Sequence, residues 1–194
     1  MGKRGRIMEI HATTVYDEKT MKDFIGFSLF KGRNYQLRRR VAFWIWPVLM
    51  LLLLGLIVLE LAMRLNADTL DTLIFAFFLC VLTWAGLFYL LPAFLFRQSK
   101  KLLGTVNTFV FQEDGFLMSS ESPLFKGDST WQYSALHKVY ETQNYLYLFI
   151  TGAQAYILQK SGITGGTAEE IRSRMMKRLP SGKYVVCRGA AGGK

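Results

Sequence analysis

The chain has 194 residues, of which 51% are hydrophobic, and it carries a formal net charge of +10. Two long apolar runs, 41–63 and 70–96, account for much of this hydrophobicity and are separated by a very short connector. The two cysteines, Cys80 and Cys187, are too few for a disulfide framework or a multi-thiolate metal site. The composition therefore excludes a small disulfide-stabilised protein and directs attention to the membrane.

Residues 1–40 predict a strand followed by an amphipathic helix, both on the cytoplasmic side. Partial alternation and β-branched residues over 7–15 indicate the strand. The helix is expected over 20–31, with Thr20 and Asp23 as its caps. Its broad apolar surface fits an interfacial helix and fits equally well a helix that packs on a cytoplasmic sheet. The strand is also able to pair with a later sheet.

The two apolar runs predict a membrane hairpin over 41–96. Each run exceeds the ~20 residues that a helix needs to cross a bilayer core, so both are expected to span. Arg and Lys residues lie just before the first run and just after the second, whereas the connector 64–69 holds a single arginine. By the positive-inside rule, the protein is expected in the cell inner (plasma) membrane as a multi-pass protein with both termini cytoplasmic.

Positive charge on the inner side suits an anionic lipid leaflet. It does not predict nucleic-acid binding, because the arginines cluster where topology requires them and no recognised nucleic-acid module accompanies them. The expected partners are therefore the lipid bilayer, and a protein or an anionic lipid at its inner surface.

Residues 97–180 predict a β meander closed by a helix. The Asp114-Gly115 pair is a signal for a tight hairpin, and a loop through Lys126 and Gly127 is expected later. Short aromatic and β-branched runs separated by turn residues give six candidate strands, at 105–112, 115–120, 129–133, 136–142, 145–151 and 154–159.

The closing helix has a recognisable start and end. Thr167 and Glu170 have the spacing of a capping box, and Pro180 with Gly182 ends the helix. Residues 181–194, rich in Gly and Ala, are expected to form a flexible tail. One apolar stripe on the helix is expected to pack on the sheet, formed by Ala168, Ile171, Met175 and Leu179.

This arrangement resembles the bacterial YcxB-like membrane proteins over roughly residues 8 to 180. The motifs that carry the resemblance are Phe109-Val110-Phe111-Gln112-Glu113-Asp114-Gly115, then Trp131, then Lys138-Val139-Tyr140-Glu141-Thr142, and then Ala155-Tyr156-Ile157-Leu158-Gln159-Lys160. Gln159 departs from the family, which often has proline there. The resemblance implies a C-terminal domain like the pleckstrin-homology (PH) superfold and little about chemistry. The expected fold is thus an α+β membrane protein, a two-helix transmembrane hairpin plus a small cytoplasmic PH-like antiparallel β domain closed by a C-terminal helix.

Three residues are candidates for a binding surface: Trp131, Lys138 and Lys160. Trp131 could present an aromatic face to a ligand, although packing within the sheet is the more common role of such a residue. Lys138 and Lys160 could contact lipid phosphates, against the simpler interpretation that they are solvated strand ends. Neither histidine has other metal-ligand residue types at ligand spacing, so no metal or cofactor is expected.

These observations favour a non-enzymatic, membrane-anchored cytoplasmic binding or adaptor module that contacts a protein partner or anionic lipid. The alternative is a small oligomeric transporter or accessory subunit that acts through the hairpin, with Glu60 facing a pathway. Glu60 also lies four residues before Arg64, which favours a simple pair at the membrane interface. No catalytic constellation is recognisable, and the sequence leaves open whether copies of the chain form a homo-oligomer.

Overall fold

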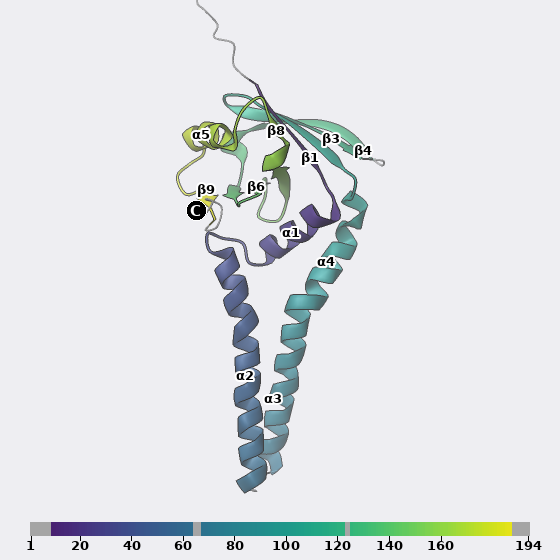
Figure 1. The fold of residues 1–194 in the computed structure, drawn as a ribbon, viewed down its shortest axis with the longest axis vertical. Helices are drawn as coiled ribbons and strands as arrows, with labels where there is room; N and C mark the ends of the chain where they lie inside the picture. The colour runs from purple at the N-terminus through teal and green to yellow at the C-terminus, as the bar shows by residue number, and fades with distance from the viewer. Residues whose placement is uncertain (1–8, 64–66, 123–124, 188–194) are drawn as a thin grey trace, which may run out of the picture. The chain divides into compact units, whose positions relative to one another are not determined.

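The computed structural model describes residues 9–63, 67–122 and 125–187. It divides into two compact units (Figure 1). Residues 1–35 and 99–194 contribute to the first, which we call the β unit, and residues 36–98 form the second, which we call the hairpin unit. The hairpin unit is thus an insertion in the sequence of the β unit.

The first sheet of the β unit has the strand order β4-β3-β2-β1-β8, and every neighbouring pair in it is antiparallel. β1 pairs with β2 over its whole length, from Ile10 opposite Phe111 to Val15 opposite Val106. The N-terminal strand therefore joins the later sheet, as the sequence allowed. The bounds of the strands are β1 (Ile10–Val15), β2 (Val106–Phe111), β3 (Gly115–Ser122), β4 (Phe125–Gln132) and β8 (Ile163–Thr164).

The turn between β2 and β3 is the predicted tight hairpin. The Gln112 amide donates a hydrogen bond of 2.9 Å to the Gly115 carbonyl oxygen, which closes the turn at Asp114-Gly115. The loop expected through Lys126 and Gly127 is wrong, because both residues lie in β4 and pair with β3. Ser and Gly in that segment imitate a loop, but cross-strand pairing with β3 keeps the backbone extended.

The second sheet has the order β7-β6-β5-β9. β5 (Lys138–Glu141), β6 (Tyr145–Phe149) and β7 (Ala155–Gln159) form the antiparallel meander that the sequence predicts. The flexible tail expected from residue 181 is wrong over β9 (Tyr184–Val186), which pairs in parallel with β5. Residues 188–194 of that expected tail lie outside the described residues.

The core lies between the two sheets and beneath the closing helix. Strand alternation produces it, because every second side chain of β1 and β2 is fully or nearly fully buried. Its members are Ile10, Ala12, Phe109, Phe111, Phe116, Met118, Tyr133, Leu136, Val139, Leu146, Leu148, Leu158, Ile171, Met175 and Leu179. The short helical turns η3 (Tyr133–Ala135) and η4 (Lys160–Gly162) connect the strands around it.

Helix α1 (Glu18–Leu29) packs on the outer face of the second sheet, which decides between the two interpretations of its apolar surface. Phe27 stacks on Tyr147 with ring centroids 4.5 Å apart, and it also contacts Tyr140. All five side chains of β6 are buried because α1 covers the face that the core does not. The helix begins earlier than expected, since Asp17 caps it by accepting from the Thr20 amide at 2.7 Å.

Helix α5 (Ala168–Arg178) is the predicted closing helix, and its capping box is confirmed. The Glu170 amide donates to Thr167 Oγ1, and the Thr167 amide donates to Glu170 Oε2. Ile171 and Met175 on its apolar stripe are fully buried.

The hairpin unit contains two helices that are long and apolar enough to cross a membrane. The first is α2 (Tyr35–Met63), and the second is assembled from α3 (Ala67–Ala85), the π-helical η1 (Gly86–Leu90) and α4 (Leu91–Ser99), followed by η2 (Lys100–Leu102). None of the most apolar window of either helix is buried within the structure. A helix that crosses a membrane carries such an unburied apolar surface, because its side chains face lipid.

Two details of the hairpin unit differ from expectation. The second helix starts at Ala67, so Asp68 and Thr69, which were expected in the connector, are helical, whereas residues 64–66 lie outside the described residues. The π-helical segment precedes Pro92, which has no N–H to donate to the carbonyl four residues earlier. The Leu91 amide donates instead to the carbonyl of Gly86, five residues back.

Candidate functional site

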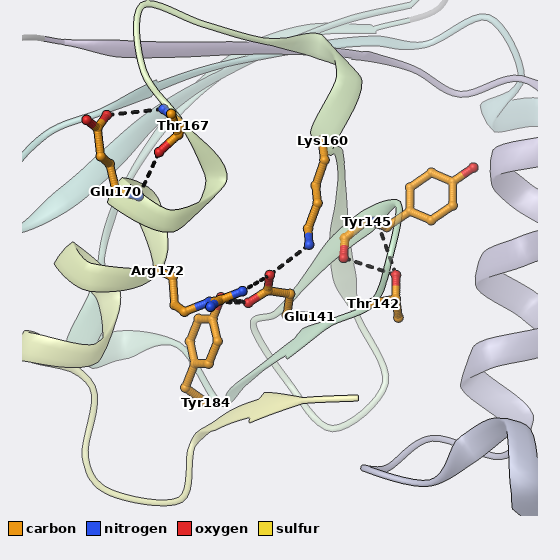
Figure 2. A network of polar contacts seen from close by, with 8 residues as sticks. All are labelled: Glu141, Thr142, Tyr145, Lys160, Thr167, Glu170, Arg172 and Tyr184. Carbon is orange, nitrogen blue, oxygen red and sulfur yellow. Dashed lines mark hydrogen bonds and ion pairs between the residues drawn. The ribbon is translucent and has the colours of Figure 1, made fainter. Parts of the chain in front are cut away.

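A buried carboxylate gathers charged and polar groups from distant parts of the β unit (Figure 2). The Glu141 side chain is fully buried. Arg172 donates from Nε to Oε2 at 2.7 Å and from Nη2 to Oε1. Lys160 Nζ donates to Oε1 at 2.7 Å, and the Tyr184 hydroxyl donates to Oε2 at 2.7 Å. We call these four residues the Glu141 cluster.

The Glu141 cluster joins four elements of the β unit. Glu141 ends β5, Lys160 follows β7, Arg172 lies on α5 and Tyr184 begins β9. Because each partner comes from a different element, the carboxylate fixes the closing helix and the last strand against the centre of the second sheet. The arrangement is a structural anchor, and no partner within the cluster is left without a hydrogen bond to the carboxylate.

Thr142, the next residue, holds the turn between β5 and β6 (Figure 2). Its hydroxyl accepts from the Tyr145 amide at 3.1 Å, and its own amide donates to the Tyr145 carbonyl oxygen at 2.8 Å. The Glu-Thr step of the sequence motif thus combines two structural tasks, an ion anchor at Glu141 and a turn at Thr142.

The electrostatics of the Glu141 cluster favour the carboxylate of Glu141 and the protonated hydroxyl of Tyr184. Burial pushes the pKa of Glu141 upward, but hydrogen bonds from Arg172, Lys160 and Tyr184 outweigh burial and bring it below its ordinary value of 4.5. Burial and the Glu141 carboxylate both raise the pKa of the Tyr184 hydroxyl, which therefore stays protonated and donates. The directions of these two pKa shifts move Glu141 and Tyr184 away from the range near pH 7 in which a general acid or base works best.

The three candidate residues do not form one site. Trp131 is partly buried against the core, where its ring lies 6.2 Å from that of Tyr156 and its Nε1 donates to Ser129 Oγ at 3.1 Å. Lys160 belongs to the Glu141 cluster, so its ammonium is committed to Glu141.

Lys138, which is partly buried, lies in a different setting, beside aromatic rings. Its Nζ lies 5.4 Å from the centroid of the Tyr140 ring, and that ring contacts Phe149 edge-on at 5.5 Å. Lys31, just beyond α1, approaches the same pair of rings, because its Nζ lies 5.2 Å from the centroid of Phe149. The exposed Lys31 also donates to the Gly152 carbonyl oxygen at 2.7 Å. We call Lys31, Lys138, Tyr140 and Phe149 the basic patch.

Sequence reasoning missed that Lys31 and Lys138 both lie beside the contacting rings of Tyr140 and Phe149. The two lysines are far apart in the chain, and Lys31 stands out in the sequence only as a charge at the end of the amphipathic helix. Phe149 provides the link, since it pairs with Lys138 across β5 and β6 while α1 delivers Lys31 to its ring. The patch follows from the packing of α1 on β6, which is a tertiary contact that no local sequence pattern reports.

Other chemistry-bearing groups in the described part of the chain are dispersed or buried. No group of three His, Cys, Asp or Glu side chains among these residues could hold a metal ion. Cys187 is buried and donates from Sγ to the Gly32 carbonyl oxygen at 3.4 Å. Burial raises the pKa of its thiol to about 11, which keeps it from acting as a thiolate nucleophile.

Comparison with known proteins gives one family. Residues 111–173 match the YcxB-like protein family. The match confirms the resemblance that the sequence motifs carry, over a shorter range than the resemblance itself. Neither the curated proteins nor the solved structures give a match.

The YcxB-like segment runs from the end of β2 into α5 and includes Glu141, Lys160 and Arg172. Tyr184, the fourth residue of the Glu141 cluster, lies beyond it, as do β1, α1 and the hairpin unit. The ion anchor is therefore mostly contained in the matched segment, and β9 adds the final hydroxyl.

Proposed function

We propose that this protein is a non-enzymatic, membrane-anchored binding module whose basic patch contacts anionic groups at the inner surface of the membrane. We place the hairpin unit in the cell inner membrane with both termini cytoplasmic. The apolar surfaces of α2 and of the α3–α4 helix support insertion. Basic residues at the two ends of the hairpin unit away from its connector support the orientation, among them Arg38, Arg39, Arg40, Arg97, Lys100 and Lys101.

We also propose that the β unit has a PH-like fold. The order of its elements supports this assignment, because β1 to β4 form one sheet, β5 to β7 form the next, and α5 follows as the closing helix. The hairpin unit with α1 would then be an insertion between the first and second strands of that fold. β8 and β9 are short additions to the edges of the two sheets.

The observation that carries the proposal is the position of the basic patch in the chain. Lys31 lies only four residues before Tyr35, where α2 begins, so a short segment of chain connects the basic patch to the first helix of the proposed membrane hairpin. Two ammonium groups beside two aromatic rings suit a phosphate or carboxylate, because each ammonium retains donors for an anion. Tethering raises the effective concentration of such a weak site near membrane targets. Anionic lipid is the first ligand that this location favours, and an acidic segment of a membrane protein is the second.

The test uses the full chain in vesicles of phosphatidylcholine, with and without phosphatidylglycerol. A membrane-impermeant amine-acylating reagent, read by mass spectrometry, reports the accessibility of each lysine on the outer side. We expect phosphatidylglycerol to protect Lys31 and Lys138, and high salt to reverse the protection. Lys177 is the matched control, because it is exposed on α5 and is not part of the patch. It should be equally reactive with and without phosphatidylglycerol.

A photo-crosslinking residue at position 138, with position 177 as its control, tests the protein ligand in native membranes. Capture of an acidic membrane-protein segment at 138 alone would assign the patch to a protein partner. The proposal would be contradicted if Lys31 and Lys138 react equally with and without phosphatidylglycerol and if positions 138 and 177 capture proteins equally.

A further inference from the structure

Strand β4 presents a long open edge within the part of the β unit that the structure describes. β4 runs over eight residues and pairs only with β3. The other sheet edges are short or covered: β8 has two residues and β9 has three. Side chains of β1 and of the residue after it cover β7, since the Gln159 amide donates to Thr14 Oγ1 and the Ile157 amide donates to Tyr16 Oη. A long open edge is a template for pairing with another strand.

The geometry of the β3–β4 pair determines which main-chain groups face outward. The Tyr133 amide donates to the Asp114 carbonyl oxygen, so position 133 faces β3. Main-chain groups in an extended strand alternate between its two neighbours. Lys126, Asp128 and Thr130 therefore direct their N–H and C=O groups to the open edge, and any added strand must pair with these residues.

We propose that β4 pairs with β4 of a second copy of this chain, antiparallel and about a twofold axis at Gly127. In this register Lys126 of each copy lies opposite Asp128 of the other, which gives two ion pairs from one contact. A symmetric interface requires this kind of self-complementarity. A shift of the axis to Asp128 would place two carboxylates opposite each other, and a shift to Ser129 would place Lys126 opposite Gln132. Charge therefore selects the register about Gly127.

The residue at the proposed axis also suits close approach of two backbones. A Cβ at position 127 would overlap the Phe125 ring, which shows that this ring lies over Gly127. The ring is 62% exposed in the single chain, although it is a large apolar group. Pairing brings a second glycine and a second Phe125 ring to the same axis, so each ring gains a neighbour that excludes water. Glycine within a strand often marks such an approach.

The existing contacts of Lys126 are compatible with this pairing. Its Nζ lies 3.3 Å from Glu121 Oε1 on β3, and both side chains are largely exposed. In the dimer, Glu121, Lys126 and Asp128 of the second copy form a row of alternating charge across three strands. One strand pair is a small interface, so its association depends on confinement of both copies in one membrane.

Cysteine crosslinking of the full chain in phosphatidylcholine vesicles tests the register. Gly127→Cys, in a Cys80→Ala background, places two thiols opposite each other, where Cα atoms of a non-hydrogen-bonded pair lie about 4.5 Å apart. We expect mild oxidation to produce a disulfide-linked dimer. Thr130→Cys is the matched control on the same strand, because its two copies would lie about 20 Å apart. The Phe125 ring that a side chain at 127 displaces is exposed, so the variant has room to fold.

Charge exchange tests the same register without an added cysteine. Asp128→Lys places like charges opposite each other at two points, and we expect roughly a tenfold weaker association, measured by energy transfer between labelled copies in phosphatidylcholine vesicles. The triple exchange Glu121→Lys, Lys126→Asp and Asp128→Lys restores opposite charges within and between copies, and it should restore association. The proposal is overturned if Thr130→Cys crosslinks as well as Gly127→Cys, if no dimer forms, or if Asp128→Lys associates as the native chain does.

Discussion

Removing the charge of Glu141 is expected to destabilise the β unit strongly. In Glu141→Gln the side chain keeps its size, but the cations of Arg172 and Lys160 lose the carboxylate between them. Breaking a buried ion pair from one side costs ~3–5 kcal/mol. Water reaches part of both cations, whose side chains are 33% and 17% exposed. We therefore expect the free energy of unfolding to fall by about 2–3 kcal/mol.

Pulse proteolysis across a urea series measures this change in the full chain in mild detergent, because only unfolded molecules are cleaved during the pulse. The matched control is Glu169→Gln, which removes an exposed carboxylate from the first turn of α5 and should cost less than about 0.5 kcal/mol. Equal unfolding midpoints for the native chain and Glu141→Gln would refute the anchoring role of the cluster.

The same variant gives a prediction for pH. Because the pKa of Glu141 in the folded chain lies below 4.5, its contribution to stability is complete above pH 4.5 and is lost as the pH falls through the lowered value. The native chain should therefore lose stability more steeply than Glu141→Gln below pH 4.5. Parallel acid profiles from the two chains would show that the cluster is not the source of this pH dependence.

Three further changes test the packing of the β unit by the same urea assay. Thr167→Ala removes the cap of α5 and should cost about 1 kcal/mol, whereas an unchanged midpoint would show that the capping box adds nothing. Phe27→Ala should cost about 3–5 kcal/mol and speed amide exchange in α1, because it removes the ring that stacks on β6. Gly162→Ala should cost about 1–3 kcal/mol, since its Cβ would collide with the Thr13 carbonyl oxygen. Gly152→Ala is its control, because a Cβ there would meet open space, and it should be near neutral. An equal cost at both positions would show that lost backbone freedom, and not the collision, destabilises Gly162→Ala.

Local patterns in the sequence determined the elements whose cause is itself local. The apolar runs predicted both long helices, which are long and apolar enough to cross a membrane, because such a run is continuous in the sequence. The Thr167 to Glu170 spacing predicted the start of α5, since a capping box involves only neighbouring residues. Asp114-Gly115 predicted the β2–β3 turn for the same reason.

Tertiary structure alone decided features in which residues far apart in the chain meet. β9 has three residues and follows a Pro and Gly segment, so only its pairing with β5 and the Tyr184 bond to Glu141 identify it as a strand. The basic patch exists because α1 packs on β6 and carries Lys31 to Phe149. Glu141 looks like one acid in a strand, and its role as an anchor depends on four elements that the fold brings together. A one-dimensional pattern reports period and spacing, whereas these contacts depend on which faces pack together in three dimensions.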